Sequence, residues 1–243
     1  MGSGIALACL RAGCDVLLLD SSDEALNAGR GRIEALLQQQ VEKGRIQSDE
    51  AAADLGRLQL AREFDSLSGV DLVIEAVFEN MDVKKEVFTT LNDTVTKDAI
   101  LATNTSYLDI NEIATVVDNP ERVLGMHYFS PVPKMPLLEI VADEHTEPDM
   151  LTKAAAFARH IDKLPLKVRS SPGFLVNRIL MPYLLEAVEL VEAGVPMTDP
   201  SRVTAASPAN LARPKSKILT RPSLLTMTLA GFRSRWTTPR AWA

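Results

Sequence analysis

The sequence has very little cysteine, and this shortage limits its chemistry. Only two cysteines, Cys9 and Cys14, occur among 243 residues. Their spacing matches neither a metal-binding pattern nor a disulfide framework, so we expect no metal site and a reducing compartment. No apolar run reaches the roughly 18 residues that a membrane helix requires, and no basic leader is present. We therefore expect no membrane span and no signal peptide.

Acidic residues are absent from residues 201–243, which contain eight Lys or Arg residues and four prolines. This segment also lacks a sustained hydrophobic period, and we predict a divergent basic tail without ordered structure. Residues 1–200 therefore carry all 32 acidic side chains against 18 basic ones. Such an acidic balance is typical of a soluble enzyme body and argues against a nucleic-acid partner.

Short apolar runs alternate with helical segments through the first 170 residues. The predicted strands are 14–20, 70–77, 99–106, 122–129, 136–141 and 163–169. The predicted helices are 22–43, 82–91, 108–117 and 148–161. This alternation predicts an α/β fold with a Rossmann-like, doubly wound and mostly parallel sheet.

A longer helix is predicted from 174 to 194. Its apolar residues recur with the spacing i, i+3, i+4 and i+7, which predicts that one wide face is buried. Pro182 predicts a kink or a missing hydrogen bond, and Gly194 is a suitable stop.

The strict G-x-G-x-x-G motif of dinucleotide-binding folds is also absent. The first twenty residues, MGSGIALACLRAGCDVLLLD, nevertheless predict a helix followed by a strand that ends at Asp20. In a dinucleotide fold such an acid binds the adenosine ribose, and Gly2 has the place of the last glycine. An ordinary helix–strand pair with Asp20 in a turn remains an alternative.

The stretch GMHYFSPVPKMPLLEI (125–140) contains His127 at the end of one apolar run and Glu139 inside the next. The histidine can accept a proton from a hydroxyl at neutral pH, and a carboxylate on its other ring nitrogen would fix the tautomer. The prolines between them allow two neighbouring strands to bring both side chains together. The alternative is a hydrogen-bonded core histidine and an unrelated glutamate at a sheet edge.

Four segments occur in order: DLVIEAVFENMDVKKEVF, TNTSYLDINEIA, GMHYFSPVPKMPLLEIV and SPGFLVNRILMPYLLEA. Over about residues 1–194 the chain resembles the L-3-hydroxyacyl-CoA dehydrogenases of fatty-acid β-oxidation. The form H-Y-F-S-P is most similar to the dehydrogenase part of multifunctional enzymes that also carry an enoyl-CoA hydratase domain. The resemblance implies oxidation of (3S)-3-hydroxyacyl-CoA to 3-oxoacyl-CoA with NAD as cofactor.

The resemblance also implies roles for residues in the reaction. It implies His127 as the general base and Glu139 as its carboxylate partner. It implies that Ser106 hydrogen-bonds the substrate oxygen and that Asn177 closes the site from a helical domain. Ser106 can instead cap the following helix, and Asn177 can instead bind backbone in its own first turn.

The cofactor residues implied by the resemblance are Gly2, Asp20, Glu79, Lys84 and Asn104. Asp20 favours NAD, because it would repel a 2′-phosphate. Glu79 and Lys84 are expected to line the nicotinamide half, although a solvated pair at a helix start is the alternative. Lys43 is expected near the CoA phosphates.

The resemblance predicts three regions. Residues 1–170 form an NAD-binding domain without its first strand, residues 171–200 begin an incomplete all-α domain, and residues 201–243 are the tail. The expected partners are an acyl-CoA substrate and either a second copy of the chain or a thiolase of a fatty-acid oxidation complex. The expected location is the bacterial cytoplasm, with peroxisome and mitochondrion left open. A catalytically inactive fragment or binding module that keeps the fold is the alternative function.

Overall fold

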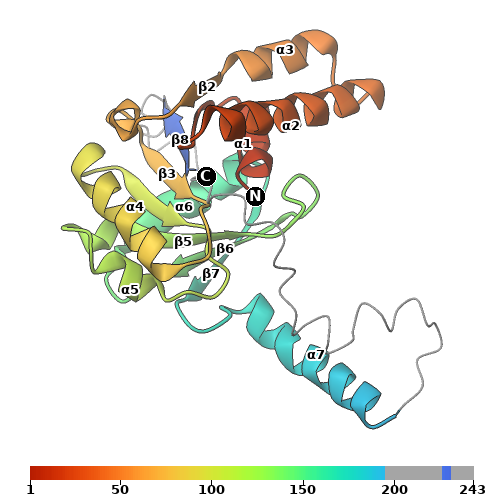
Figure 1. Ribbon diagram of the computed structural model, residues 1–243, viewed down its shortest axis with the longest axis vertical. Coiled ribbons are helices and arrows are strands. Elements are labelled where there is room, and N and C mark those ends of the chain that lie inside the picture. The colour runs from red at the N-terminus through yellow and green to blue at the C-terminus, as the bar shows by residue number, and fades with distance from the viewer. Residues whose placement is uncertain (195–225, 231–243) are drawn as a thin grey trace.

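The computed structural model describes residues 1–194 and 226–230, and it builds them around one sheet with helices on both faces (Figure 1). The strands are β1 (Asp15–Leu19), β2 (Leu58–Ala61), β3 (Leu72–Glu75), β4 (Ile100–Thr103), β5 (Val123–Tyr128), β6 (Leu137–Ala142), β7 (Leu164–Arg169) and β8 (Thr226–Ala230). The α-helices are α1 (Gly2–Arg11), α2 (Asp23–Glu42), α3 (Ser48–Gly56), α4 (Met81–Thr94), α5 (Ile110–Ala114), α6 (Pro148–His160) and α7 (Val176–Glu192). The 3₁₀ helices are η1 (Phe64–Leu67) and η2 (Pro120–Arg122).

The strand order is β2-β1-β8-β3-β4-β5-β6-β7. Parallel pairing joins β1 to β2, β3 to β4, β4 to β5 and β6 to β7. The predicted α/β fold with a mostly parallel sheet is therefore confirmed. The sequence patterns did not predict α3 or β2, which lie between residues 44 and 69.

The sheet separates two hydrophobic cores, and successive strand residues alternate between them. In β3, Leu72 and Ile74 belong to the core that contains residues of α1, α2 and α6, whereas Val73 belongs to the core beneath α4 and α5. This period-two alternation is expected where both faces of a sheet are covered. It explains why these strands are continuously apolar in sequence.

Strand β8 differs from the expectation for the tail. Residues 226–230 pair antiparallel with both β1 and β3, so they occupy the centre of the sheet. The predicted absence of ordered structure is therefore wrong for these five residues. A strand paired on both sides gains its ladder of backbone hydrogen bonds whatever the composition of the flanking segments. Residues 195–225 and 231–243 lie outside the described residues.

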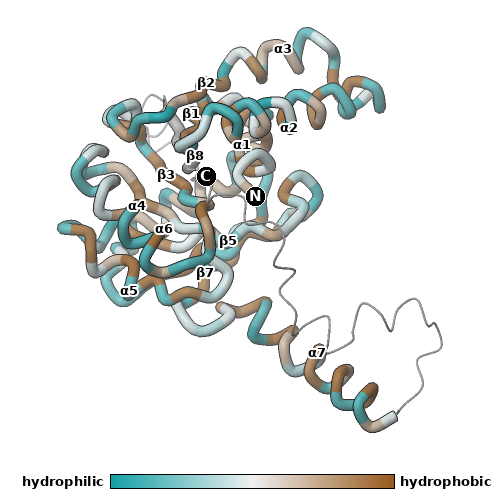
Figure 2. The backbone as a smooth tube through the Cα atoms, in the orientation of Figure 1, coloured by the Kyte–Doolittle hydropathy of each residue, from teal (hydrophilic) through white to brown (hydrophobic). Residues whose placement is uncertain are grey.

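Helix α7 forms where the sequence predicts it, but the expected burial is wrong. No residue of α7 is buried, and Ile179 and Tyr183 expose 67% and 70% of their surfaces. The helix projects away from the sheet (Figure 1), and hydrophobic positions recur along its whole length (Figure 2). The amphipathic period thus predicted the helix correctly, while the described residues supply no surface that covers it.

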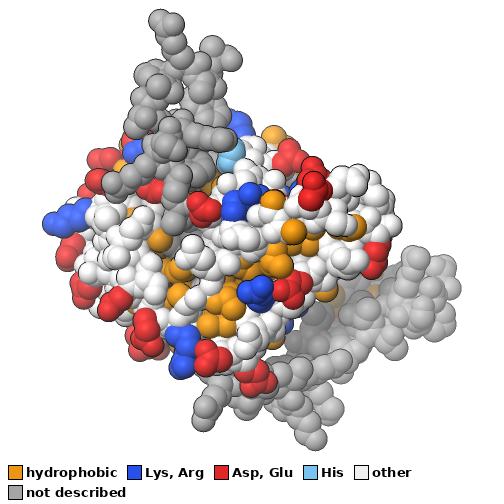
Figure 3. Space-filling view, turned by 90° about the horizontal axis from the view of Figure 1, so that it is seen from above, with side chains coloured by type: hydrophobic (Ala, Val, Ile, Leu, Met, Phe, Trp, Pro, Cys, Tyr) orange, Lys and Arg blue, Asp and Glu red, His pale blue; other side chains and the backbone are white. Residues whose placement is uncertain are grey.

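The strands β1, β3, β4 and β5 bring their carboxyl ends to one edge of the sheet, where ligands of open α/β folds bind. Gly125 allows β5 to pack closely there, because a Cβ at this position would lie 2.5 Å from Ile110 Cδ1. Elsewhere on the surface, a group of hydrophobic side chains lies near the middle of the face seen in Figure 3, with acidic and basic side chains around it.

Candidate active site

His127 and Glu139 meet across two antiparallel strands. They are direct partners in the register of β5 and β6. The Nδ1 atom of His127 lies 2.7 Å from Oε2 of Glu139, and both side chains are almost completely buried. The sequence-based pairing of these two residues is thus present in the structure. Because Glu139 engages Nδ1, the Nε2 atom is the ring nitrogen left to face a substrate.

The second carboxylate oxygen of Glu139 binds the start of α7. Its Oε1 atom accepts hydrogen bonds from the backbone N–H groups of Leu175 and Val176, each at 3.0 Å. The preceding residue, Phe174, has φ = 49°, in the left-handed region that bulky residues rarely adopt. This turn directs the two N–H groups toward the carboxylate, and sequence patterns gave no sign of it.

The surroundings of Glu139 favour its ionised form. Burial alone would raise the pKa of Glu139, but hydrogen bonds from His127, Val176 and Leu175, together with the charge of His127, lower the pKa below its ordinary value. The imidazole also stands against two aromatic rings, since its centroid lies 4.6 Å from that of Phe129 and 5.6 Å from that of Phe174. The pair is therefore a carboxylate and an imidazole held in an apolar enclosure.

Asn104, Ser106 and Asn177 lie beside this pair. The Oδ1 atom of Asn104 accepts a hydrogen bond from the N–H of Tyr128, the residue after the histidine. The Nδ2 atom of Asn177 lies 3.5 Å from the backbone oxygen of Ser106, at the outer limit of a hydrogen bond. The loop after β4 and the first turn of α7 therefore converge near the end of β5.

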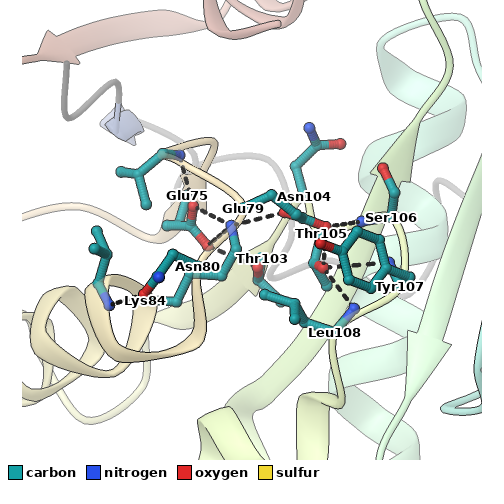
Figure 4. A network of polar contacts seen from close by, with 12 residues as sticks. Glu75, Glu79, Asn80, Lys84, Thr103, Asn104, Thr105, Ser106, Tyr107 and Leu108 are labelled. Atoms are coloured by element: carbon teal, nitrogen blue, oxygen red, sulfur yellow. Dashed lines mark hydrogen bonds and ion pairs between the residues drawn. The ribbon is translucent and has the colours of Figure 1, made fainter. Parts of the chain in front are cut away.

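A buried ionic network supports the loop that carries Ser106 (Figure 4). The Nζ atom of Lys84 lies 2.8 Å and 3.0 Å from the two carboxylate oxygens of Glu75, and 3.4 Å from Oε2 of Glu79. Glu79 accepts hydrogen bonds from Thr105 Oγ1 at 2.6 Å and from the N–H of Ser106 at 2.7 Å. Lys84 is completely buried, so its charge acts on these two carboxylates. Glu79, which is partly exposed, connects the lysine to the loop.

Sequence reasoning missed Glu75. This residue ends β3, is completely buried, and also accepts hydrogen bonds from Thr103 Oγ1 and from the N–H of Val77. A signal was available, because Glu75 is a single acid within the apolar run LVIEAV (72–77). The same signal drew attention to Glu139 within PLLEIV.

A cavity of ≈ 210 Å³ beside the start of α1 includes Asp20. The Oδ1 atom of Asp20 accepts a hydrogen bond from the N–H of Ser22, whereas the buried Oδ2 atom has no partner among the described residues. Burial raises the pKa of Asp20, although the N–H groups of Ser22 and Ser21 and the charge of Arg32 oppose this rise. An unpaired carboxylate oxygen at the end of this strand fits a ribose that donates its hydroxyl groups.

Two other predicted residues lie at the periphery of this arrangement. Gly2 is the first residue of α1 and is buried, and Lys43 is exposed at the C-terminal end of α2. Within the described ranges, no cluster of His, Cys, Asp or Glu side chains has the geometry of a metal site. None of the described helices is both long and apolar enough to cross a membrane.

Comparison with known proteins gives consistent matches. Residues 1–171 match the family described as 3-hydroxyacyl-CoA dehydrogenase, NAD binding domain. A glyoxysomal fatty acid beta-oxidation multifunctional protein from Brassica napus is 38% identical over 200 residues, which are 82% of this chain. The alpha subunit of a fatty acid oxidation complex from Pseudomonas entomophila is 39% identical over 195 residues, or 80% of this chain. This chain spans 27% of the length of each of these two relatives.

This chain spans a larger share of one protein of known structure than of the two multifunctional relatives. The structure of (S)-3-hydroxybutyryl-CoA dehydrogenase from Ralstonia eutropha superimposes with a TM-score of 0.80 at 33% identity. The match covers 88% of this chain and 75% of that protein.

Proposed function

The chain belongs to the 3-hydroxyacyl-CoA dehydrogenase family and carries its NAD-binding domain, and from this membership we propose that it oxidises (3S)-3-hydroxyacyl-CoA to 3-oxoacyl-CoA. The observation that carries the proposal is the His127–Glu139 pair with its second carboxylate oxygen bound to α7. Oxidation of a secondary alcohol requires one group that takes the hydroxyl proton and another that takes a hydride.

His127 is the general base in this proposal. Glu139 accepts the hydrogen bond from Nδ1–H, which leaves the lone pair of Nε2 free to take the proton of the substrate hydroxyl. The carboxylate then stabilises the imidazolium that forms. Burial of both groups strengthens this interaction, because the local dielectric constant is low.

Asp20 holds the adenosine ribose through its unpaired Oδ2 atom, and bound NAD supplies the hydride acceptor. Ser106 hydrogen-bonds the substrate oxygen from the loop after β4, while Asn177 approaches that loop from α7. Glu79 borders the nicotinamide side and holds the Ser106 loop, and the buried Lys84 supports it there through its ion pair with Glu79. Lys43 contributes charge for the CoA phosphates.

The stereochemical outcome tests this function. The chain should reduce NAD when supplied with (3S)-3-hydroxybutyryl-CoA and should leave the (3R) isomer unchanged. Retained NADH binding without turnover of the (3S) substrate would contradict the proposal and would favour a binding module.

The relatives' names support a proposal for the assembly and the location. The two multifunctional relatives support an acyl-CoA substrate, and we propose association with a thiolase or with a second copy of the chain. Relatives are named from bacteria, glyoxysomes and peroxisomes, and we propose a reducing compartment, the bacterial cytoplasm.

A further inference from the structure

The cavity that includes Asp20 also contains a basic side chain that the proposed chemistry has not used. Its lining residues are Met1, Asp20, Ala25, Arg32, Ala76, Val77 and Phe78. Arg32 is the one cationic side chain in this lining, and it projects from the middle of α2 toward the start of α1.

Arg32 differs from four of the five other arginines within residues 1–62. Arg11, Arg30, Arg57 and Arg62 each form an ion pair with a carboxylate. Within residues 1–194, no carboxylate lies at ion-pair distance from the guanidinium of Arg32. Its Nε atom instead donates a hydrogen bond to Ser3 Oγ at 3.3 Å, and the side chain is otherwise exposed.

The contact with Ser3 ties Arg32 to the first turn of α1. The N-terminus of a helix presents free N–H groups and the positive end of the helix dipole, and it is therefore a favourable place for an anion. A second, independent feature also indicates a ligand here, since the completely buried Asp20 has a carboxylate oxygen without a partner in the described part of the chain. The cavity thus combines an acceptor for hydroxyl groups with a donor for an anion.

We propose that Arg32 binds the pyrophosphate of the dinucleotide, next to the ribose that Asp20 holds. This inference rests on the proposed function for the identity of the ligand. A guanidinium matches phosphate geometry with two parallel N–H donors, and it also offsets the repulsion between the phosphate and the nearby Asp20 carboxylate. Arg32 is therefore a residue that determines affinity for the phosphate part of the ligand, separate from the residues that react.

Calorimetric titration of the full chain tests this role. Arg32→Gln should raise the Kd for NADH and for ADP by about ten- to hundredfold, the range for a lost hydrogen bond to a charged group. Its affinity for adenosine should stay the same, because adenosine has no phosphate. Arg32→Lys should recover part of the loss, since it keeps the charge without the planar fork. Arg30→Gln is the matched control, because Arg30 lies one half-turn away on α2 and pairs with exposed Glu34.

Each outcome has a definite meaning. Unchanged NADH affinity in Arg32→Gln, together with weakened binding in Asp20→Asn, would overturn the role of Arg32 while the proposed function stands. A loss confined to NADPH would assign Arg32 to a 2′-phosphate and would overturn the pyrophosphate assignment. If the wild-type chain binds ADP but not NADH, the proposed function fails while the phosphate site stands.

Discussion

Glu139 faces His127 directly across β5 and β6, and its two oxygens have different partners. One oxygen lies 2.7 Å from the histidine ring, and the other accepts the N–H groups of Leu175 and Val176. A single carboxylate therefore connects the proposed base with the beginning of α7. This arrangement explains why one acid interrupts an otherwise apolar strand.

The charge of Glu139 should control the pH dependence of the reaction. Glu139→Gln keeps an oxygen that can accept the N–H groups of α7 but removes the charge that stabilises imidazolium. We expect the rate to fall on the order of 10²- to 10⁴-fold, and the rising limb of the pH–rate profile to move to lower pH. Stopped-flow measurement of kcat/KM for (3S)-3-hydroxybutyryl-CoA between mildly acidic and alkaline pH provides the test. A slower reaction with an unmoved profile would indicate that Glu139 acts through packing.

The lowered pKa of Glu139 also predicts a dependence of stability on pH. Because the folded pKa lies below the ordinary value of 4.5, the ionised carboxylate stabilises the fold above that pH, and the contribution is lost as the pH falls through the folded value. The wild type should therefore lose more stability on acidification than Glu139→Gln does. Urea unfolding at several pH values measures this difference, with Glu24→Gln on the exposed start of α2 as control. Parallel curves for wild type and Glu139→Gln would contradict the prediction.

Replacing Lys84 should lower the free energy of unfolding far more than replacing Lys85, its neighbour in sequence. Lys84→Met leaves the carboxylate of Glu75 buried beside an apolar group, and we expect a loss of about 3–5 kcal/mol in the free energy of unfolding. The double variant Glu75→Leu/Lys84→Met should recover much of that loss. Lys85→Met is the matched control, because Lys85 pairs with the exposed Glu112 and should cost about 1 kcal/mol or less. Equal unfolding midpoints for the two lysine variants would refute a special role for the buried pair.

Strand β8 offers a test of the fold itself. Thr228 pairs with Leu17 on one side and with Val73 on the other, so a proline there has no free edge to occupy. Thr228→Pro should lower stability by about 1–3 kcal/mol, the cost of a lost buried hydrogen bond. Hydrogen exchange should also show faster exchange in the peptides that contain β1 and β3. If those peptides exchange as slowly in Thr228→Pro as in the wild type, β8 is not needed to complete the sheet.

The sequence allowed prediction of the elements whose patterns are local. Apolar runs identified β1 and β3 to β7, and their ends identified His127 and Asp20 as candidate site residues. The position of β8 could not be predicted, because pairing with β1 and β3 depends on contacts between residues more than 150 positions apart. The burial of α7 was predicted wrongly, since an amphipathic period indicates an apolar face but not whether another surface covers it. Glu75 and Arg32 required the packed structure, because their roles depend on which groups surround them.

The most direct measurement of the central claim compares NADH oxidation by the wild type and by His127→Ala, with acetoacetyl-CoA as substrate. His145→Ala is the matched control, because that histidine is exposed in the turn before α6. We predict acetoacetyl-CoA-dependent loss of NADH in the wild type and in the control. In His127→Ala the turnover number should fall by roughly two to four orders of magnitude, while NADH affinity is retained. Near-normal turnover in His127→Ala, or no turnover in a wild type that binds NADH, would contradict the account.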